Sequence, residues 1–172
     1  MFRPALAPGV LSEGHVTAQQ FRDAFAQLPT GVTILTCYTP DGRPAGMTAS
    51  AVCSLSQDPP MALAAVGNAG RTLSFIRAHG AFGINVLRAQ QAPLAALFAR
   101  AAADPADRFA GLRHDRIASV PVLHRPLAWL ACELTGAHPG GDHTILTGLV
   151  RAAEHGTGRP LIRHDRGFTA TA

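Results

Sequence analysis

The sequence contains no lysine: all 15 basic residues among its 172 residues are arginines, spread from Arg3 to Arg166 without a run. It also has only one Trp and one Tyr. Proteins that bind nucleic acids usually concentrate basic residues on one stripe or helix and add aromatic rings on which bases stack. The scattered arginines and the net charge of +4 therefore argue against nucleic-acid binding, and fit a solvated surface with one or two anion contacts.

Cysteine is scarce as well. Cys37, Cys53 and Cys132 form no CxxC pair and leave an odd number, which predicts small buried side chains in a reducing compartment rather than disulfides. Proline and glycine interrupt the apolar residues of the N-terminus, so no signal-peptide core forms, and no apolar run is long enough to span a membrane. We therefore expect a cytoplasmic protein.

Several familiar catalytic motifs are missing. The sequence has no nucleophile elbow, no P-loop and no GxGxxG, which argues against hydrolases, nucleoside triphosphatases and Rossmann dinucleotide-binding domains. Its eight histidines show no HxH, HxxxH or HExxH spacing. Because zinc needs three or four ligands, we expect no metal site.

The length suits one domain. Residues 1–16, rich in proline and glycine, are predicted to form a flexible arm, and residues 17–172 the folded domain. Hydrophobic residues account for 47% of the chain and charged residues for only 15%. Such an apolar composition suggests a buried interface between subunits.

The order of the predicted elements indicates the fold class. A helix is expected from Thr17, where Gln20 completes a capping box and Phe21, Phe25 and Leu28 form one apolar stripe. Two further helices are predicted over 70–79 and 89–102, residues 104–121 are predicted to be irregular, and strands are predicted over 31–38, 46–56, 61–66, 82–87, 128–134, 143–153 and 167–170. Strands dominate without regular alternation with helices, which predicts a mainly β antiparallel barrel with short helices outside it.

The second predicted strand carries the first candidate site. Thr48 and Ser50 should point to one face of an extended strand, because side chains alternate with a period of two. Two hydroxyls at that spacing can contact a phosphate or the polar rim of a ring system. The alternative is an ordinary solvated strand face.

The segment Gly67-Asn-Ala-Gly-Arg-Thr72 follows a strand and opens a helix. A helix N-terminus presents unpaired N–H groups and favours anions. Arg71 adds a bidentate phosphate donor and Thr72 a hydroxyl. This context predicts phosphate binding; the alternative is a plain turn with a surface arginine.

Gly140-Gly-Asp-His143 precedes the sixth predicted strand. The glycines permit a tight turn or the close approach of a ligand, and His143 can donate a hydrogen bond or a proton. The alternative is a turn histidine without a catalytic role.

Taken in order, these stretches resemble the flavin reductase-like family, the short-chain reductase components of two-component flavin monooxygenases. The similarity covers roughly residues 17 to 169. It is carried by residues 28–36 (LPTGVTILT), 46–50 (GMTAS), 54–61 (SLSQDPPM), 82–87 (FGINVL), 90–91 (QQ), 97–99 (LFA), 108–109 (RF), 121–123 (PVL) and 141–143 (GDH).

The resemblance implies an FMN-binding split β-barrel that forms a homodimer, with flavin in a groove near the interface. It implies that Arg71 and Thr72 lie at the phosphate and His143 on the nicotinamide side of the ring. The other residues that it implies for flavin contact are Thr48, Ala49 and Ser50 along the flavin, Ser54 and Leu55 near its ring or ribityl chain, and Thr30 near the ring.

Two positions depart from the family pattern. Ala69 and Gly70 stand where many relatives carry a serine before the basic residue, so phosphate binding would depend on Arg71 and backbone N–H groups. Phe168 stands where a tyrosine is common, which removes a hydroxyl.

The activity implied by the resemblance is hydride transfer from NADH or NADPH to FMN or FAD, with reduced flavin passing to a partner monooxygenase. One alternative keeps the fold but holds FMN permanently and acts directly on a substrate. Another is a flavin-binding module without catalytic activity.

Overall fold

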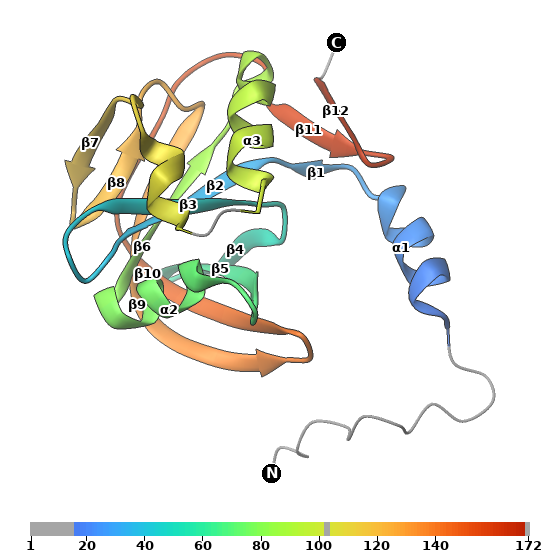
Figure 1. Ribbon diagram of the computed structural model, residues 1–172, viewed down its shortest axis with the longest axis horizontal. Helices are drawn as coiled ribbons and strands as arrows, with labels where there is room; N and C mark the ends of the chain where they lie inside the picture. The colour runs from blue at the N-terminus through green and yellow to red at the C-terminus, as the bar shows by residue number, and fades with distance from the viewer. Residues whose placement is uncertain (1–15, 102–103, 171–172) are drawn as a thin grey trace.

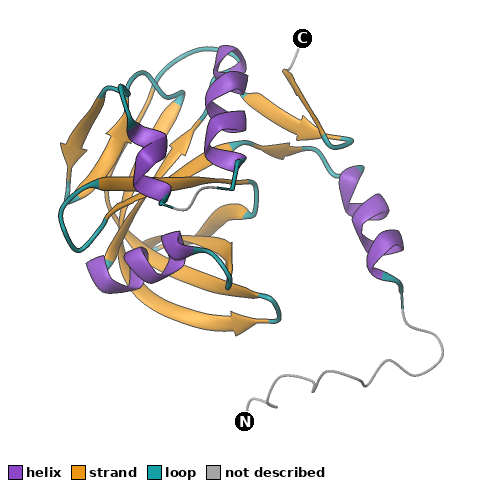
Figure 2. Cartoon of the chain, in the orientation of Figure 1, coloured by secondary structure: helices purple, strands orange, loops and turns teal. Residues whose placement is uncertain are grey.

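The computed structural model describes residues 16–101 and 104–170, about half of which form antiparallel strands (Figures 1 and 2). The predicted N-terminal arm lies outside the described residues except for Val16. No helix within residues 16–101 or 104–170 is long and apolar enough to cross a membrane.

The elements are as follows. The helices are α1 (Ala18–Ala26), α2 (Arg71–His79) and α3 (Ala92–Ala99), with short 3-10 turns η1 (Ala89–Gln91) and η2 (Pro105–Phe109). The strands are β1 (Thr30–Gly31), β2 (Thr33–Tyr38), β3 (Pro44–Ala49), β4 (Val52–Gln57), β5 (Pro60–Gly67), β6 (Ala81–Val86), β7 (His114–Ile117), β8 (Val120–Leu123), β9 (Ala128–Gly140), β10 (His143–His155), β11 (Leu161–His164) and β12 (Gly167–Ala170).

Seven strands form the main sheet in the order β3-β2-β6-β9-β10-β5-β4. Its two edge strands, β3 and β4, are consecutive in the chain and are separated only by Ser50 and Ala51, yet no backbone ladder joins them in the described residues. The sheet therefore curls into an antiparallel barrel that stays split between these edges. This confirms the predicted fold class.

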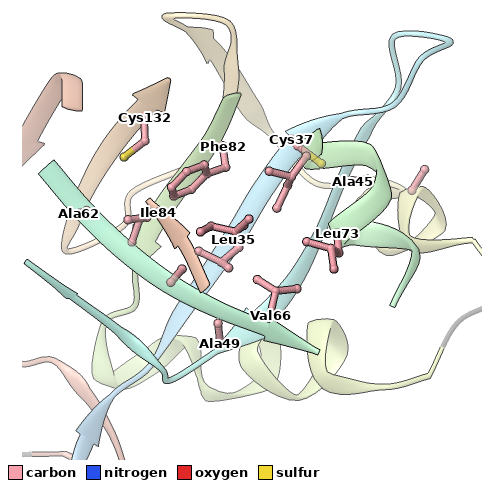
Figure 3. Close-up of a cluster of buried hydrophobic side chains, with 14 residues drawn as sticks. Leu35, Cys37, Ala45, Ala49, Ala62, Val66, Leu73, Phe82, Ile84 and Cys132 are labelled. Carbon is pink, nitrogen blue, oxygen red and sulfur yellow. The ribbon is translucent and has the colours of Figure 1, made fainter. Parts of the chain in front are cut away.

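The core lies inside the curled sheet. Figure 3 shows Leu35 of β2, Phe82 of β6 and Val66 of β5 directed into one cluster. Along β5 the side chains of Ala62, Ala64 and Val66 are buried and the odd-numbered ones, such as Leu63 and Ala65, are only partly buried. A period of two is what a strand with one face on a core requires, so the odd positions lie on the outer face of the barrel.

The three helices differ in what they cover. Leu73 and Ile76 of α2 pack into the main core, and Ala95 and Phe98 of α3 pack into a second cluster. Helix α1 buries no residue and projects away from the barrel (Figure 1).

Polar contacts fix α1 to the turn between β11 and β12. The Asp165 N–H donates to the Ala26 carbonyl at 2.7 Å, and the Arg166 guanidinium pairs with Asp23. Asp165 and Arg166 both have positive φ, at 44° and 63°. The small sheet β1-β11-β12 and α1 thus form a wing beside the barrel.

Several predicted elements have different bounds. The expected strand over 46–56 is divided into β3 and β4, because the chain crosses at Ser50 and Ala51 from one edge of the sheet to the other. The expected helix over 89–102 is a 3-10 turn followed by α3. The region predicted to be irregular contains η2 and the β7–β8 hairpin, and β9 and β10 are longer than expected, at 13 residues each.

Candidate functional site

A groove of about 710 Å³ separates α1 from the outer face of the barrel. Phe21, Phe25 and Leu28 line it on the α1 side, and Leu63 and Ala65 of β5 line the barrel side. Binding sites for small ligands and cofactors have volumes of about 300–1,000 Å³ and mostly apolar walls. This groove has the size and character of such a site.

Two of the predicted flavin contacts lie in this groove. Thr30 of β1 and Ser50 of the β3–β4 connection both line it, together with their neighbours Ala51, Val52 and Cys53. The hydroxyls of Thr30 and Ser50 place polar atoms beside apolar walls.

The neighbouring residues Thr48 and Ala49 do not reach the groove. The Thr48 hydroxyl donates to the Ala95 carbonyl of α3 at 2.7 Å. Ala49 is buried in the core, and its carbonyl accepts a hydrogen bond from the Thr33 hydroxyl at 2.8 Å. Thr48 and Ser50 are separated because β3 ends at Ala49, so strict alternation no longer applies to Ser50.

Ser54 and Leu55 lie on the edge strand β4 and are exposed. Ser54 pairs with Ala62, and the register shifts between Ser54 and Ser56. Neither Ser54 nor Leu55 lines the groove. Their predicted contact with the flavin stays a prediction.

The predicted phosphate residues stand at the start of α2. Arg71 is the first residue of the helix and its guanidinium carbon lies 5.2 Å from the centre of the Phe75 ring. Thr72 is 2% exposed. The helix is capped by Gly70, which supplies no side-chain acceptor for the first N–H groups, and these groups favour an anion.

His143 lies beside this helix start. It pairs with Gly67 across β10 and β5, and a Cβ atom on Gly67 would lie 3.9 Å from its Nε2. Its Nδ1 lies 2.7 Å from a carboxylate oxygen of Asp142, a contact that lowers the pKa of Asp142. Directly paired residues project from the same face, so His143 stands on the outer face that Leu63 and Ala65 present to the groove.

Asn68 is a residue that sequence reasoning missed. Its N–H donates to the Asp142 carbonyl at 3.0 Å, its amide donates to Gly141, and its Oδ1 accepts from the Thr144 hydroxyl at 2.8 Å. Asn68 therefore ties the start of α2 to the turn that carries His143. An asparagine directly after a strand was the available signal.

These residues fit a flavin nucleotide. The apolar groove suits a flat ring system, the Ser50 and Thr30 hydroxyls suit its polar rim, and the α2 start suits a phosphate. The groove and the α2 start lie along the same strand, because Ala65 lines the groove and Gly67 ends β5 two residues later, before α2 begins.

Comparisons with known proteins identify the family of the chain. The family model described as flavin reductase like domain matches residues 25–172. The chain is 38% identical over 152 residues to flavin reductase (NADH) of Kitasatospora aureofaciens, covering 87% of this chain and 78% of that protein. It is 39% identical over 142 residues to the reductase component of 4-nitrophenol 4-monooxygenase/4-nitrocatechol 2-monooxygenase of Rhodococcus opacus, covering 83% and 75%.

A solved structure shares the fold as well. The NADH:FAD oxidoreductase SgcE6 of Streptomyces globisporus, in complex with NAD and FAD fragments, superposes with a TM-score of 0.82 at 30% identity. The match covers 90% of this chain and 92% of that one.

Proposed function

The chain belongs to the flavin reductase-like domain family, and we propose on that basis that it is an NAD(P)H:flavin oxidoreductase. It reduces FMN or FAD by hydride transfer and supplies reduced flavin to a partner monooxygenase. The structural observation that supports this proposal is the apolar groove on the outer face of β5, the strand that ends before the anion-favouring start of α2.

The chain's own residues bind and orient the two substrates. The groove walls hold the ring and exclude water from one side of it, while Ser50 and Thr30 donate hydrogen bonds to its rim. Arg71, Thr72 and the first N–H groups of α2 bind the phosphate. Hydride acceptance is the chemistry that the flavin supplies when bound.

His143 is a positioning group in this proposal. Its Nδ1 contacts Asp142, and its Nε2 lies beside Gly67 without a role in that contact. A donor at that atom orients the nicotinamide or stabilises negative charge. It is not an obligatory base, because hydride transfer itself removes no proton.

A homodimer is part of the proposal. Phe21 and Phe25 of α1 are 55% and 58% exposed, Leu28 just after the helix is 54% exposed, and Leu55 of β4 is also exposed. A contiguous exposed apolar stripe is unusual on a monomer. A second copy that covers this stripe would also roof the groove. We further propose a cytoplasmic location, where NADH, NADPH and the partner oxygenase are available.

The test is a steady-state assay of NADH and NADPH oxidation with FMN, FAD and riboflavin, each under anaerobic conditions. Turnover that saturates with free flavin supports the proposal. No turnover with all three flavins would refute it and favour a non-catalytic flavin-binding module.

Dialysis separates the remaining alternative. A reductase that releases its product loses its flavin absorbance on extensive dialysis. Flavin retained at one equivalent per chain would favour an enzyme that holds FMN permanently and acts directly on another substrate.

A further inference from the structure

Three arginines from distant parts of the chain border the groove. Arg22 comes from α1, Arg163 from β11 and Arg166 from the turn after it, and together we call them the arginine rim. No acidic residue lines the groove within the described chain.

The rim has an excess of positive charge. Arg166 pairs with Asp23, and Arg22 donates to the uncharged Gln19 side chain at 2.8 Å. Arg163 forms no ion pair within residues 16–101 and 104–170. Two carboxylates, Asp23 and Asp165, therefore accompany three guanidinium groups, which leaves an excess of one positive charge.

Arg163 is placed to act on a groove ligand. It pairs with Thr30 in the ladder between β1 and β11, and both residues line the groove. Paired residues project from one face of a sheet. A guanidinium group binds phosphate oxygens through two parallel N–H donors, so an anion beside Thr30 lies within reach of this side chain.

The rim is separate from the predicted phosphate site. Arg71 stands at the start of α2, beyond Gly67, and does not line the groove. The site thus offers positive charge in two places, whereas FMN has a single phosphate. The arginine rim, the second of these positive regions, therefore suits a ligand that carries a further anionic group.

We infer that the arginine rim binds the diphosphate of a dinucleotide, with Arg163 as the principal contact. The inference rests on the proposed function and makes Arg163 a specificity-determining residue. Two dinucleotides carry this diphosphate, the nicotinamide substrate and FAD, and the experiment distinguishes them.

The test compares Arg163→Gln with Arg113→Gln, a matched loss of an exposed arginine outside the groove. Calorimetric titration with ADP-ribose, which contains the diphosphate without nicotinamide or flavin, should give a dissociation constant about tenfold higher for Arg163→Gln than for the wild type. Arg113→Gln should bind like the wild type. Equal binding by all three proteins would overturn the inference.

Kinetics identify the source of the diphosphate. If it belongs to the nicotinamide substrate, Arg163→Gln raises KM for NADH about tenfold and leaves KM for reduced nicotinamide mononucleotide within about twofold. If it belongs to FAD, the variant raises KM for FAD and spares FMN. Equal effects on the dinucleotide and its mononucleotide in both pairs would overturn the inference.

The experiments distinguish failure of this inference from failure of the proposed function. If the wild-type enzyme turns over normally and Arg163→Gln matches it in every assay, the arginine rim does not bind a diphosphate, but the reductase proposal stands. A wild-type chain without turnover refutes the reductase, and the ADP-ribose titration then still reports on the rim.

Discussion

Helices α1 and α2 each have nine residues and an apolar stripe, but only one of them is buried. Leu73 and Ile76 of α2 are 4% and 0% exposed in the main core, whereas Phe21 and Phe25 of α1 remain more than half exposed. Periodicity identifies both helices but does not say what covers their apolar faces. The apolar face of α2 packs against the barrel. The apolar face of α1 lines the groove, and we propose that a second copy of the chain packs against it.

The largest expected effect is a loss of stability when the buried apolar stripe of α2 is disrupted. Ile76→Ala leaves a cavity in the main core and should lower the free energy of unfolding by about 3 kcal/mol, measured by urea denaturation at fixed protein concentration. Phe25→Ala removes a larger side chain that is 58% exposed in the single chain, and should lower the free energy of unfolding of the monomer, measured at a protein concentration too low for self-association, by less than half as much. Equal losses would contradict the contrast between the helices.

The fold could be predicted from the sequence where it depends on neighbouring residues, and not where it depends on tertiary pairing. Local patterns predicted the capping box at Thr17, because it depends on residues within one turn. They missed the break after Ala49, because it depends on which edges of the sheet β3 and β4 occupy. That arrangement is set by tertiary pairing.

The candidate site was predictable to a similar degree. Ser50 and Thr30 were named and do line the groove, while the Thr48 hydroxyl is taken by the backbone of α3. The arginine rim was not predicted, because Arg22 and Arg163 are far apart in sequence and meet only through the wing. A single sequence carries no local signal for such a cluster.

The next expected effect concerns the exposed stripe. Phe25→Glu puts a charge on the face that the proposed second copy covers and should weaken self-association at least about tenfold, since an unpaired charge is costly to bury. Sedimentation velocity over a concentration series measures it. The matched control is Ala78→Glu on the exposed side of α2; dissociation by the control to the same extent would contradict an interface at α1.

The next prediction tests whether the start of α2 binds the flavin phosphate. Arg71→Ala should raise KM for FMN about tenfold, because a charge-assisted contact is lost. KM for riboflavin, which has no phosphate, should change less than about twofold. Steady-state kinetics with both flavins provide the measurement, and equal effects on the two would remove Arg71 from the phosphate site.

The smallest expected effect concerns the reactivity of the thiols, which differ between the core and the groove. Cys37 and Cys132 are buried, and burial raises the pKa of each to about 12, whereas Cys53 is exposed and lines the groove. At pH 8 the native protein should therefore react with one equivalent of a thiol reagent per chain, and the unfolded protein with three, because thiolates are the reactive species.

Saturating FMN should slow the native reaction about threefold by covering Cys53, a change that corresponds to a fraction of a kcal/mol. Cys53→Ser should abolish the native reaction while leaving two thiols in the unfolded chain. If FMN leaves the rate unchanged although it is reduced at the normal rate, the ring does not lie against β4, and the groove would have to serve the nicotinamide alone.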